Sequence, residues 1–161
     1  MELLRSYGIK PEITEEYFRG VPINVLFAGE LRPLQKEAGV RLLDHDHGVL
    51  SAPTAFGKTV IGAWLIAQRR VNTLVLVHRT QLMDQWRERL ALFLNLPMEE
   101  IGQIGGGKKK ITGMIDIGLM QSLNRKGQVK DLVAEYGQVI VDECHHIPAF
   151  TFEQVLKQVK A

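Results

Sequence analysis

The sequence predicts an α/β fold, and three observations point to it. The apolar run Thr73–Val77 has the composition of a buried strand and turns directly into an amphipathic helix that reaches about Leu92. A second apolar run, Gly48–Ala52, leads through a turn into a segment with helical periodicity, Thr59–Arg70. A third, Val139–Val141, also reads as a buried strand, and such strands are typical of parallel sheets that are covered by helices on both faces.

The remaining segments extend this pattern. The segment Leu31–Gln35 opens a helix that runs to about Leu43, and Pro33 suits its first turn. A tip of three glycines and three lysines, Gly105–Lys110, separates two short strand-like runs and is typical of a hairpin. The runs on either side of that tip, Glu100–Ile104 and Lys110–Ile117, are expected to be strands. We also expect a last helix at Thr151–Lys160, and short helical and strand-like pieces at Glu12–Arg19 and Val21–Phe27.

Composition limits the class of protein without naming a partner. A chain of 161 residues with 45% hydrophobic content suits one globular domain with a core of its own. Its apolar runs fall far short of the roughly 20 residues that span a membrane, and its N-terminus lacks the apolar centre of a secretory signal. The net charge of +2 indicates that any nucleic-acid surface is local. A single cysteine, Cys144, rules out an internal disulfide and favours a reducing, cytoplasmic location.

The loop that ends at Gly57 has the features of a phosphate site. It connects a predicted strand to a predicted helix, and a helix N-terminus offers unpaired N–H groups and the positive end of the helix dipole to an anion. Gly57 lets the backbone approach closely, Lys58 can reach the β- and γ-phosphates, and the Thr59 hydroxyl is suited to bind Mg²⁺. The alternative is a glycine turn with an exposed lysine.

Two adjacent acids, Asp142 and Glu143, end the strand Val139–Val141. Because neighbouring side chains of a strand point in opposite directions, one carboxylate can hold Mg²⁺ through its water shell while the other orients an attacking water. The alternative is a solvated acidic turn. The two motifs together therefore predict a nucleotide-hydrolysing site.

These motifs resemble those of superfamily 2 helicases and translocases, whose motif I looks like APTAFGKT (Ala52–Thr59) and whose motif II looks like DECH (Asp142–His145). The resemblance implies a three-layer α/β/α P-loop NTPase fold of the RecA type with a mainly parallel central sheet, incomplete at its C-terminal end. It divides the chain into a lead, residues 1–28, and an N-terminal RecA-like ATP-binding domain, residues 29–161, truncated after motif II. XPB-type repair helicases and restriction-type translocases look most similar, whereas RNA-directed DEAD-box enzymes carry aspartate at the position of His145.

The resemblance also implies roles for single residues. Lys58, Asp142 and Glu143 are expected to be catalytic, Thr59 and Asp142 to bind Mg²⁺, and His145 to couple the nucleotide state to a second lobe. The family commonly has glycine at the position of Ala55, so this backbone is less free to adopt a positive φ. A glutamine at the position of Gln35 reads adenine in the family; the alternative is a solvent-facing glutamine at a helix start. The residues expected to bind ATP are Arg32, Gln35, Thr54, Ala55, Phe56, Gly57, Lys58 and Thr59.

Three segments are expected to contact nucleic acid, with DNA as the partner. In the family, the turn after the strand Thr73–Val77 touches the nucleic-acid backbone, and a guanidinium and a hydroxyl are good phosphate partners. The segment Ile115–Leu123 looks like a family strand that ends in Gln-Ser, which is again a nucleic-acid contact position. The alternatives are a solvated loop arginine and an ordinary lysine-rich hairpin tip. The residues of the three segments are Arg79 and Thr80, Gln121 and Ser122, and Lys108 and Lys109.

The function that the resemblance implies is the ATP-binding lobe of an ATP-dependent helicase or translocase that moves along DNA. The sequence holds no motif III and no second RecA-like lobe, so we expect this polypeptide alone to hydrolyse little ATP. The alternatives are a standalone nucleotide-binding or interaction module, an RNA helicase lobe, and a small-molecule P-loop kinase. The segment DHDHG, Asp44–Gly48, is interpreted as a polar loop and not as a metal site, because adjacent alternating ligands rarely converge on one ion.

Overall fold

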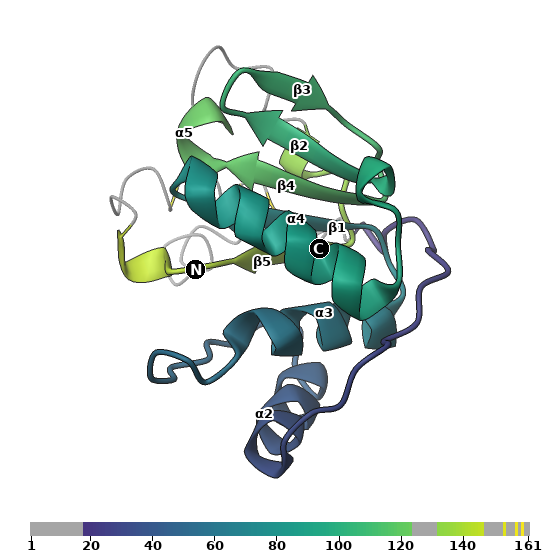
Figure 1. Ribbon diagram of the computed structural model, residues 1–161, viewed down its shortest axis with the longest axis vertical. Coiled ribbons are helices and arrows are strands. Elements are labelled where there is room, and N and C mark those ends of the chain that lie inside the picture. Colours follow the sequence, from purple (N-terminus) through teal and green to yellow (C-terminus); the bar gives the residue numbers. More distant parts are fainter. Residues whose placement is uncertain (1–17, 124–131, 147–152, 154–156, 158, 160–161) are drawn as a thin grey trace, which may run out of the picture.

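A computed structural model describes residues 18–123 and 132–146, together with residues 153, 157 and 159. Its centre is a five-stranded sheet in the order β3-β2-β4-β1-β5 (Figure 1). The strands β2, β4, β1 and β5 run parallel, and β3 pairs with β2 in the antiparallel direction. The strand bounds are β1 Thr73–Val77, β2 Ile101–Gly105, β3 Lys108–Lys110, β4 Ile115–Leu119 and β5 Gln138–Val141.

Two long helices pack on one face of this sheet, and the short helix α5 packs on the other. One face packs against α3, Lys58–Arg69, and α4, Thr80–Leu94, and Figure 1 shows α4 lying across β4 and β1. The core on this side joins buried residues of both helices to strand side chains, including Ile66, Leu90 and Ile117, all at most 1% exposed. Burial of large aliphatic side chains of this kind stabilises the fold by about 2 kcal/mol each.

The opposite face of the sheet has a core of its own. It contains Leu74 and Leu76 of β1, Met120 of the short helix α5, and Tyr136 from the segment that leads into β5. The alternation of β1 sends its odd and even residues to the two cores, and all five of its residues are buried. The predicted three-layer α/β fold with a mainly parallel sheet is therefore confirmed.

The predicted helices form close to their expected bounds, and the hairpin forms with a different second strand. The strand expected at Lys110–Ile117 is wrong, because β3 ends at Lys110 and residues 111–114 separate it from β4. Helix α2, Pro33–Leu43, carries Pro33 at its start, as the sequence predicted. The turn between β2 and β3 is formed by Gly106 and Gly107, which both have positive φ values that glycine adopts without strain. The remaining bounds are α5 Met120–Leu123 and the 3₁₀ turns η1 Met98–Glu100 and η2 Cys144–His146.

The strand expected at Gly48–Ala52 is also wrong, and other expected strands are shorter than expected. Residues 48–53 are irregular, and the Val49 side chain is 86% exposed. An apolar run becomes a strand only when a neighbouring strand pairs with its backbone and another layer covers its side chains. In the described sheet β5 is the edge strand, so residues 48–53 do not pair with it as a further strand. The segment Val21–Phe27 forms only a single bridge, Pro22 to Val71, although Ile23 and Val25 are buried in the core.

The strand expected to end in Gln-Ser stops at Leu119, and residues 120–123 form the helical turn α5. The expected segment Glu12–Arg19 and the last helix, Thr151–Lys160, lie largely outside the described residues. Among the residues that the structure describes, no helix is both long enough and apolar enough to cross a membrane.

Candidate nucleotide and nucleic-acid site

The predicted site residues gather at the edge of the sheet where the four parallel strands end. In the strand register, Val77 of β1 lies beside Leu119 of β4, and Ile104 of β2 lies beside Gly118. On the other side of β1, Leu76 lies beside Val141 of β5. Ligands of open parallel sheets bind at this edge. The segments that leave the strands here are His78–Thr80, Met120–Ser122, Gly106–Lys109 and Asp142–His145.

The phosphate loop reaches this edge at the N-terminus of α3. Gly57 is the N-cap of α3, with a left-handed φ of 93°, and a Cβ added there would lie 2.4 Å from Gln35 Nε2. Ala55 also has a positive φ, 64°. This is the position at which the family commonly has glycine, which adopts such a φ without strain. An alanine in this conformation costs about 1 kcal/mol, and such strain is typical of functional loops. The first turn of α3 presents the N–H groups that lack intrahelical partners.

The start of helix α2 holds the phosphate loop through the carbonyl groups of Phe56 and Ala55. The Nε2 of Gln35 donates a hydrogen bond to the Phe56 carbonyl oxygen at 2.7 Å, and its Oε1 accepts one from the Arg32 N–H at 2.9 Å. The Arg32 guanidinium donates to the same Phe56 carbonyl and, at 3.4 Å, to that of Ala55. Gln35 is only 4% exposed, so the alternative of a solvent-facing glutamine is wrong. Adenine contact by Gln35 and Arg32 stays a prediction.

The lysine of the phosphate loop contacts the acidic motif directly. Lys58 Nζ lies 2.7 Å from Glu143 Oε1, and His145 Nδ1 lies 3.4 Å from Glu143 Oε2. The hydrogen bond to Glu143 is the main reason why the pKa of Lys58 is raised; burial opposes this shift, and the nearby charges of Glu143 and Asp142 add to it. Glu143 has a left-handed φ of 51°. Motifs 85 residues apart in the sequence therefore form one site, and the alternative of a solvated acidic turn is not supported.

Asp142 is held from two sides. Its backbone N–H donates to the Leu76 carbonyl oxygen at 2.9 Å, and its Oδ2 accepts a hydrogen bond from Trp86 Nε1 at 2.7 Å. Trp86 was missed as a site residue because it lies on the buried stripe of α4 with Met83 and Leu90, which predicts a core position. The carboxylate of Asp142 and the hydroxyl of Thr59, the second residue of α3, are hard oxygen donors of the kind that Mg²⁺ prefers.

The segments predicted to contact nucleic acid lie side by side at the same edge. A Cβ added to Gly105 would lie 2.6 Å from Ser122 Oγ, and one added to Gly106 would lie 3.3 Å from Thr80 Cγ2. The hairpin tip therefore packs between the start of α4 and α5. The side chains of Arg79, Thr80, Gln121, Lys108 and Lys109 belong to exposed residues. Lys108 Nζ lies 3.9 Å from Asp84 Oδ1, a weak surface pair.

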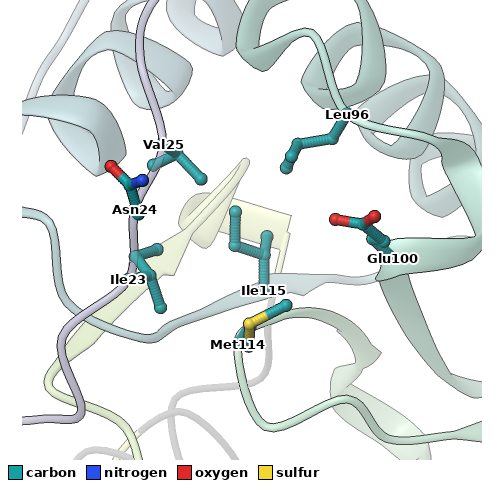
Figure 2. Close-up of a pocket in the computed structure, with 7 residues that line it drawn as sticks. All are labelled: Ile23, Asn24, Val25, Leu96, Glu100, Met114 and Ile115. Carbon is teal, nitrogen blue, oxygen red and sulfur yellow. The ribbon is translucent and has the colours of Figure 1, made fainter.

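Other candidate sites lie elsewhere. Figure 2 shows a small pocket around Ile115, the first residue of β4, and hence at the end of the strands opposite to the phosphate loop. Its polar side chains are those of Asn24 and Glu100. In the segment DHDHG, the His45 carbonyl oxygen accepts a hydrogen bond from Arg69 at 2.7 Å. Within the described part of the chain, no three His, Cys, Asp or Glu side chains are grouped as metal ligands.

Known proteins share this sequence pattern and this fold. The family described as "Type III restriction enzyme, res subunit" matches residues 28–161. A putative DNA 3'-5' helicase, Rad25 of Halobacterium salinarum, is 36% identical over 132 residues, which are 81% of this chain and 22% of that protein. The DNA 3'-5' translocase XPB2 of Sulfurisphaera tokodaii is 32% identical over 149 residues, which are 91% of this chain and 33% of that protein.

A solved structure agrees in fold. The UvsW helicase of Bacteriophage T4 superimposes with a TM-score of 0.70 at 20% identity, over 99% of this chain and 64% of that one. The fold therefore defines an α/β lobe of the RecA type. The chain belongs to the Type III restriction enzyme res subunit family, and its resemblance to the first lobe of superfamily 2 DNA helicases is confirmed. It spans 22% and 33% of the length of the two curated relatives.

Proposed function

We propose that this chain is the ATP-binding lobe of an ATP-dependent DNA helicase or translocase, in which hydrolysis of Mg·ATP drives movement along DNA. The contact that carries the proposal is the 2.7 Å ion pair between Lys58 of the phosphate loop and Glu143 of the DECH motif. It brings a phosphate-binding cation and a candidate general base together at a helix N-terminus. The names of the relatives, a DNA 3'-5' helicase and a DNA 3'-5' translocase, favour DNA as the track.

The ion pair also suggests the order of events when ATP binds. The triphosphate competes with Glu143 for Lys58, because the phosphate oxygens carry more negative charge than one carboxylate. Glu143 is then released to orient the attacking water and to accept its proton. Thr59 and Asp142 would hold Mg²⁺, which would supply positive charge to neutralise the phosphate oxygens. His145, which contacts Glu143, can report the nucleotide state to a second RecA-like lobe, whose arginine would complete the site.

The proposed DNA track runs over the hairpin tip, the start of α4 and α5. The Gly106 backbone lies against Thr80, and Gly105 lies against Ser122, so one phosphate backbone can follow all three segments. Arg79, Lys108 and Lys109 would supply positive charge, and the hydroxyls of Thr80 and Ser122 and the amide of Gln121 would hydrogen-bond to phosphate oxygens. Binding of this kind depends on salt and is nearly independent of base sequence.

The nucleotide half of the proposal is tested by Glu143→Gln in the full-length protein. We expect ATP hydrolysis that DNA stimulates more than RNA does, and we expect the variant to bind ATP but to lose turnover by about 100-fold or more, because the base is gone and the shape is kept. Glu88→Gln, an exposed glutamate on α4, is the matched control and should hydrolyse normally. Normal turnover by Glu143→Gln would show that Glu143 is not the base.

The DNA half is tested by Arg79→Ala against Arg89→Ala. Both arginines are exposed. Arg79 is the N-cap of α4 and Arg89 lies within the same helix, but only Arg79 lies at the proposed track. Loss of one phosphate contact should weaken DNA binding for all sequences and reduce the slope of log affinity against log salt by about 1. Arg89→Ala should leave both unchanged. An equal effect of the two substitutions would mean that general charge, and not this track, attracts DNA.

A further inference from the structure

The indole of Trp86 reaches the acidic motif from the core. Trp86 is 3% exposed, and its Nε1 donates the 2.7 Å hydrogen bond to Asp142 Oδ2. A buried indole N–H needs an acceptor, and here that acceptor is the carboxylate at the carboxyl end of β5. A tryptophan on an apolar helix stripe is thereby joined to the candidate Mg²⁺ site.

The fold makes room for this contact at one glycine. A Cβ added to Gly62 of α3 would lie 2.6 Å from Trp86 Cη2 and 3.1 Å from Cζ3, so the outer edge of the six-membered ring of the indole lies close to the backbone of α3. The Ile140 side chain of β5 bounds the same space. Wedged between two helices and a strand, the ring has one orientation, and its N–H therefore has one direction.

A fixed N–H fixes the carboxylate that it binds. The Asp142 backbone is tied to Leu76 of β1, and the hydrogen bond from Trp86 restricts the remaining side-chain rotation. An ionised carboxylate has about four acceptor sites, so one bond to Oδ2 leaves Oδ1 and its lone pairs for the water shell of Mg²⁺. A charge-assisted bond of this kind is stronger than a neutral one, and partners that orient metal ligands in this way typically contribute about 10-fold or more to metal affinity.

We propose that Trp86 is a positioning residue for nucleotide hydrolysis, whose indole N–H holds the Asp142 carboxylate in the orientation that binds Mg·ATP. This inference rests on the proposed function, since it takes Asp142 as the carboxylate that holds the metal. Gly62 supports this contact, because the absence of a Cβ lets the indole approach the backbone of α3. The ring of Trp86 packs in the core, and its N–H binds the carboxylate of the candidate Mg²⁺ site.

The first test is Trp86→Phe in the full-length protein, which removes the N–H and keeps most of the apolar ring. The Mg²⁺ concentration that gives half-maximal binding of a fluorescent ATP analogue should rise about 10-fold. Binding of the same analogue with Mg²⁺ chelated by EDTA should not change. The control is Trp64→Phe, a half-buried tryptophan that packs on Gly39 of α2, and it should leave the Mg²⁺ dependence unchanged. An unchanged Mg²⁺ dependence in Trp86→Phe overturns the proposal.

A double-mutant cycle separates positioning from a loss of packing. If Trp86 acts through Asp142, then Trp86→Phe should have no further effect on Mg²⁺ dependence in an Asp142→Ala background. An additive effect means that the ring acts by packing alone, and overturns the inference. If Asp142→Ala by itself leaves the Mg²⁺ dependence unchanged, then the proposed role of Asp142 fails, and that result is distinct from failure of the Trp86 contact alone.

A further measurement does not depend on the stability of Trp86→Phe. The sequence has two tryptophans, so Trp64→Phe leaves Trp86 as its one tryptophan, whose emission can be excited selectively over that of the tyrosines. Because its N–H binds the carboxylate that would hold Mg²⁺, its emission should shift when Mg²⁺ is added to the complex with nucleotide, and Asp142→Asn should reduce that shift. An emission that does not respond to Mg²⁺ contradicts the proposal.

Discussion

The network around Asp116 allows a stability prediction whose size follows from its contacts. Asp116 is the second residue of β4 and has no exposed surface. Its carboxylate accepts hydrogen bonds from the Thr112 N–H at 2.9 Å, the Thr112 hydroxyl at 3.1 Å, the Gly113 N–H at 2.8 Å and the Tyr136 hydroxyl at 2.5 Å. It thus connects the turn before β4 to the segment before β5, at the end of the strands opposite to the candidate nucleotide site.

Replacing Asp116 with alanine should destabilise the fold by about 4 kcal/mol. The Tyr136 hydroxyl is left without its acceptor in the core, which costs about 2 kcal/mol, because Tyr136 is 1% exposed and water cannot replace the carboxylate. The three donors of Thr112 and Gly113 lie in a partly exposed turn where water can take over, so each contributes less than about 1 kcal/mol. Tyr136→Phe removes one donor and keeps the other three satisfied, and it should cost only about 1 kcal/mol.

Urea unfolding followed by circular dichroism measures both variants. The midpoints should fall in the order wild type, Tyr136→Phe, Asp116→Ala, with similar slopes. A loss of under about 1 kcal/mol in Asp116→Ala, or a larger loss in Tyr136→Phe, would refute the reasoning, since the carboxylate would then not organise the network.

Three further predictions concern stability. Gly102→Ala should destabilise by about 3 kcal/mol or more in urea unfolding, because its Cβ would lie 1.6 Å from Asp116 Oδ1; a mild loss would mean that the carboxylate can move. Burial, and then the bond to Asp116, raise the pKa of Tyr136 above its ordinary 10, so the folded state favours the neutral phenol and stability should fall as the pH rises above about 10. This loss should be smaller in Tyr136→Phe, and equal losses in alkaline melts would contradict it. Phe93→Leu removes a ring stacked on Phe27 with centroids 5.9 Å apart, and should lower stability by about 1 kcal/mol in thermal unfolding, with no loss if the stack is incidental.

Much of the fold and of the candidate site follows from local patterns. Helix α4 was predictable because Met83, Trp86 and Leu90 repeat at helical spacing, and β1 because the four apolar residues Leu74–Val77 follow one another. The nearness of Lys58 and Glu143 was also predictable, since a helix N-terminus and a strand end meet at the same edge of a parallel sheet.

The strand expected at Gly48–Ala52 shows what local sequence patterns cannot predict. Its composition suits a strand, yet a strand depends on hydrogen bonds to a neighbour that the segment does not itself contain. Asp116 is a similar case, because an aspartate within an apolar run is explained only by donors that arrive from the turn before it and from Tyr136, 20 residues away.

The sequence by itself therefore determined the motifs of the candidate site, a phosphate loop and an acidic pair, and most of the order of helices and strands, because all of these depend on short-range spacing. Only the tertiary structure decided which side chains orient them. The hydrogen bond between Trp86 and Asp142 joins residues 56 positions apart, and it needs glycine at position 62 because a Cβ there would collide with the indole. The hydrogen bond from Gln35 to the phosphate loop needs glycine at position 57 for the same reason. Contacts of this kind depend on shape complementarity between distant segments, which spacing along the chain does not encode.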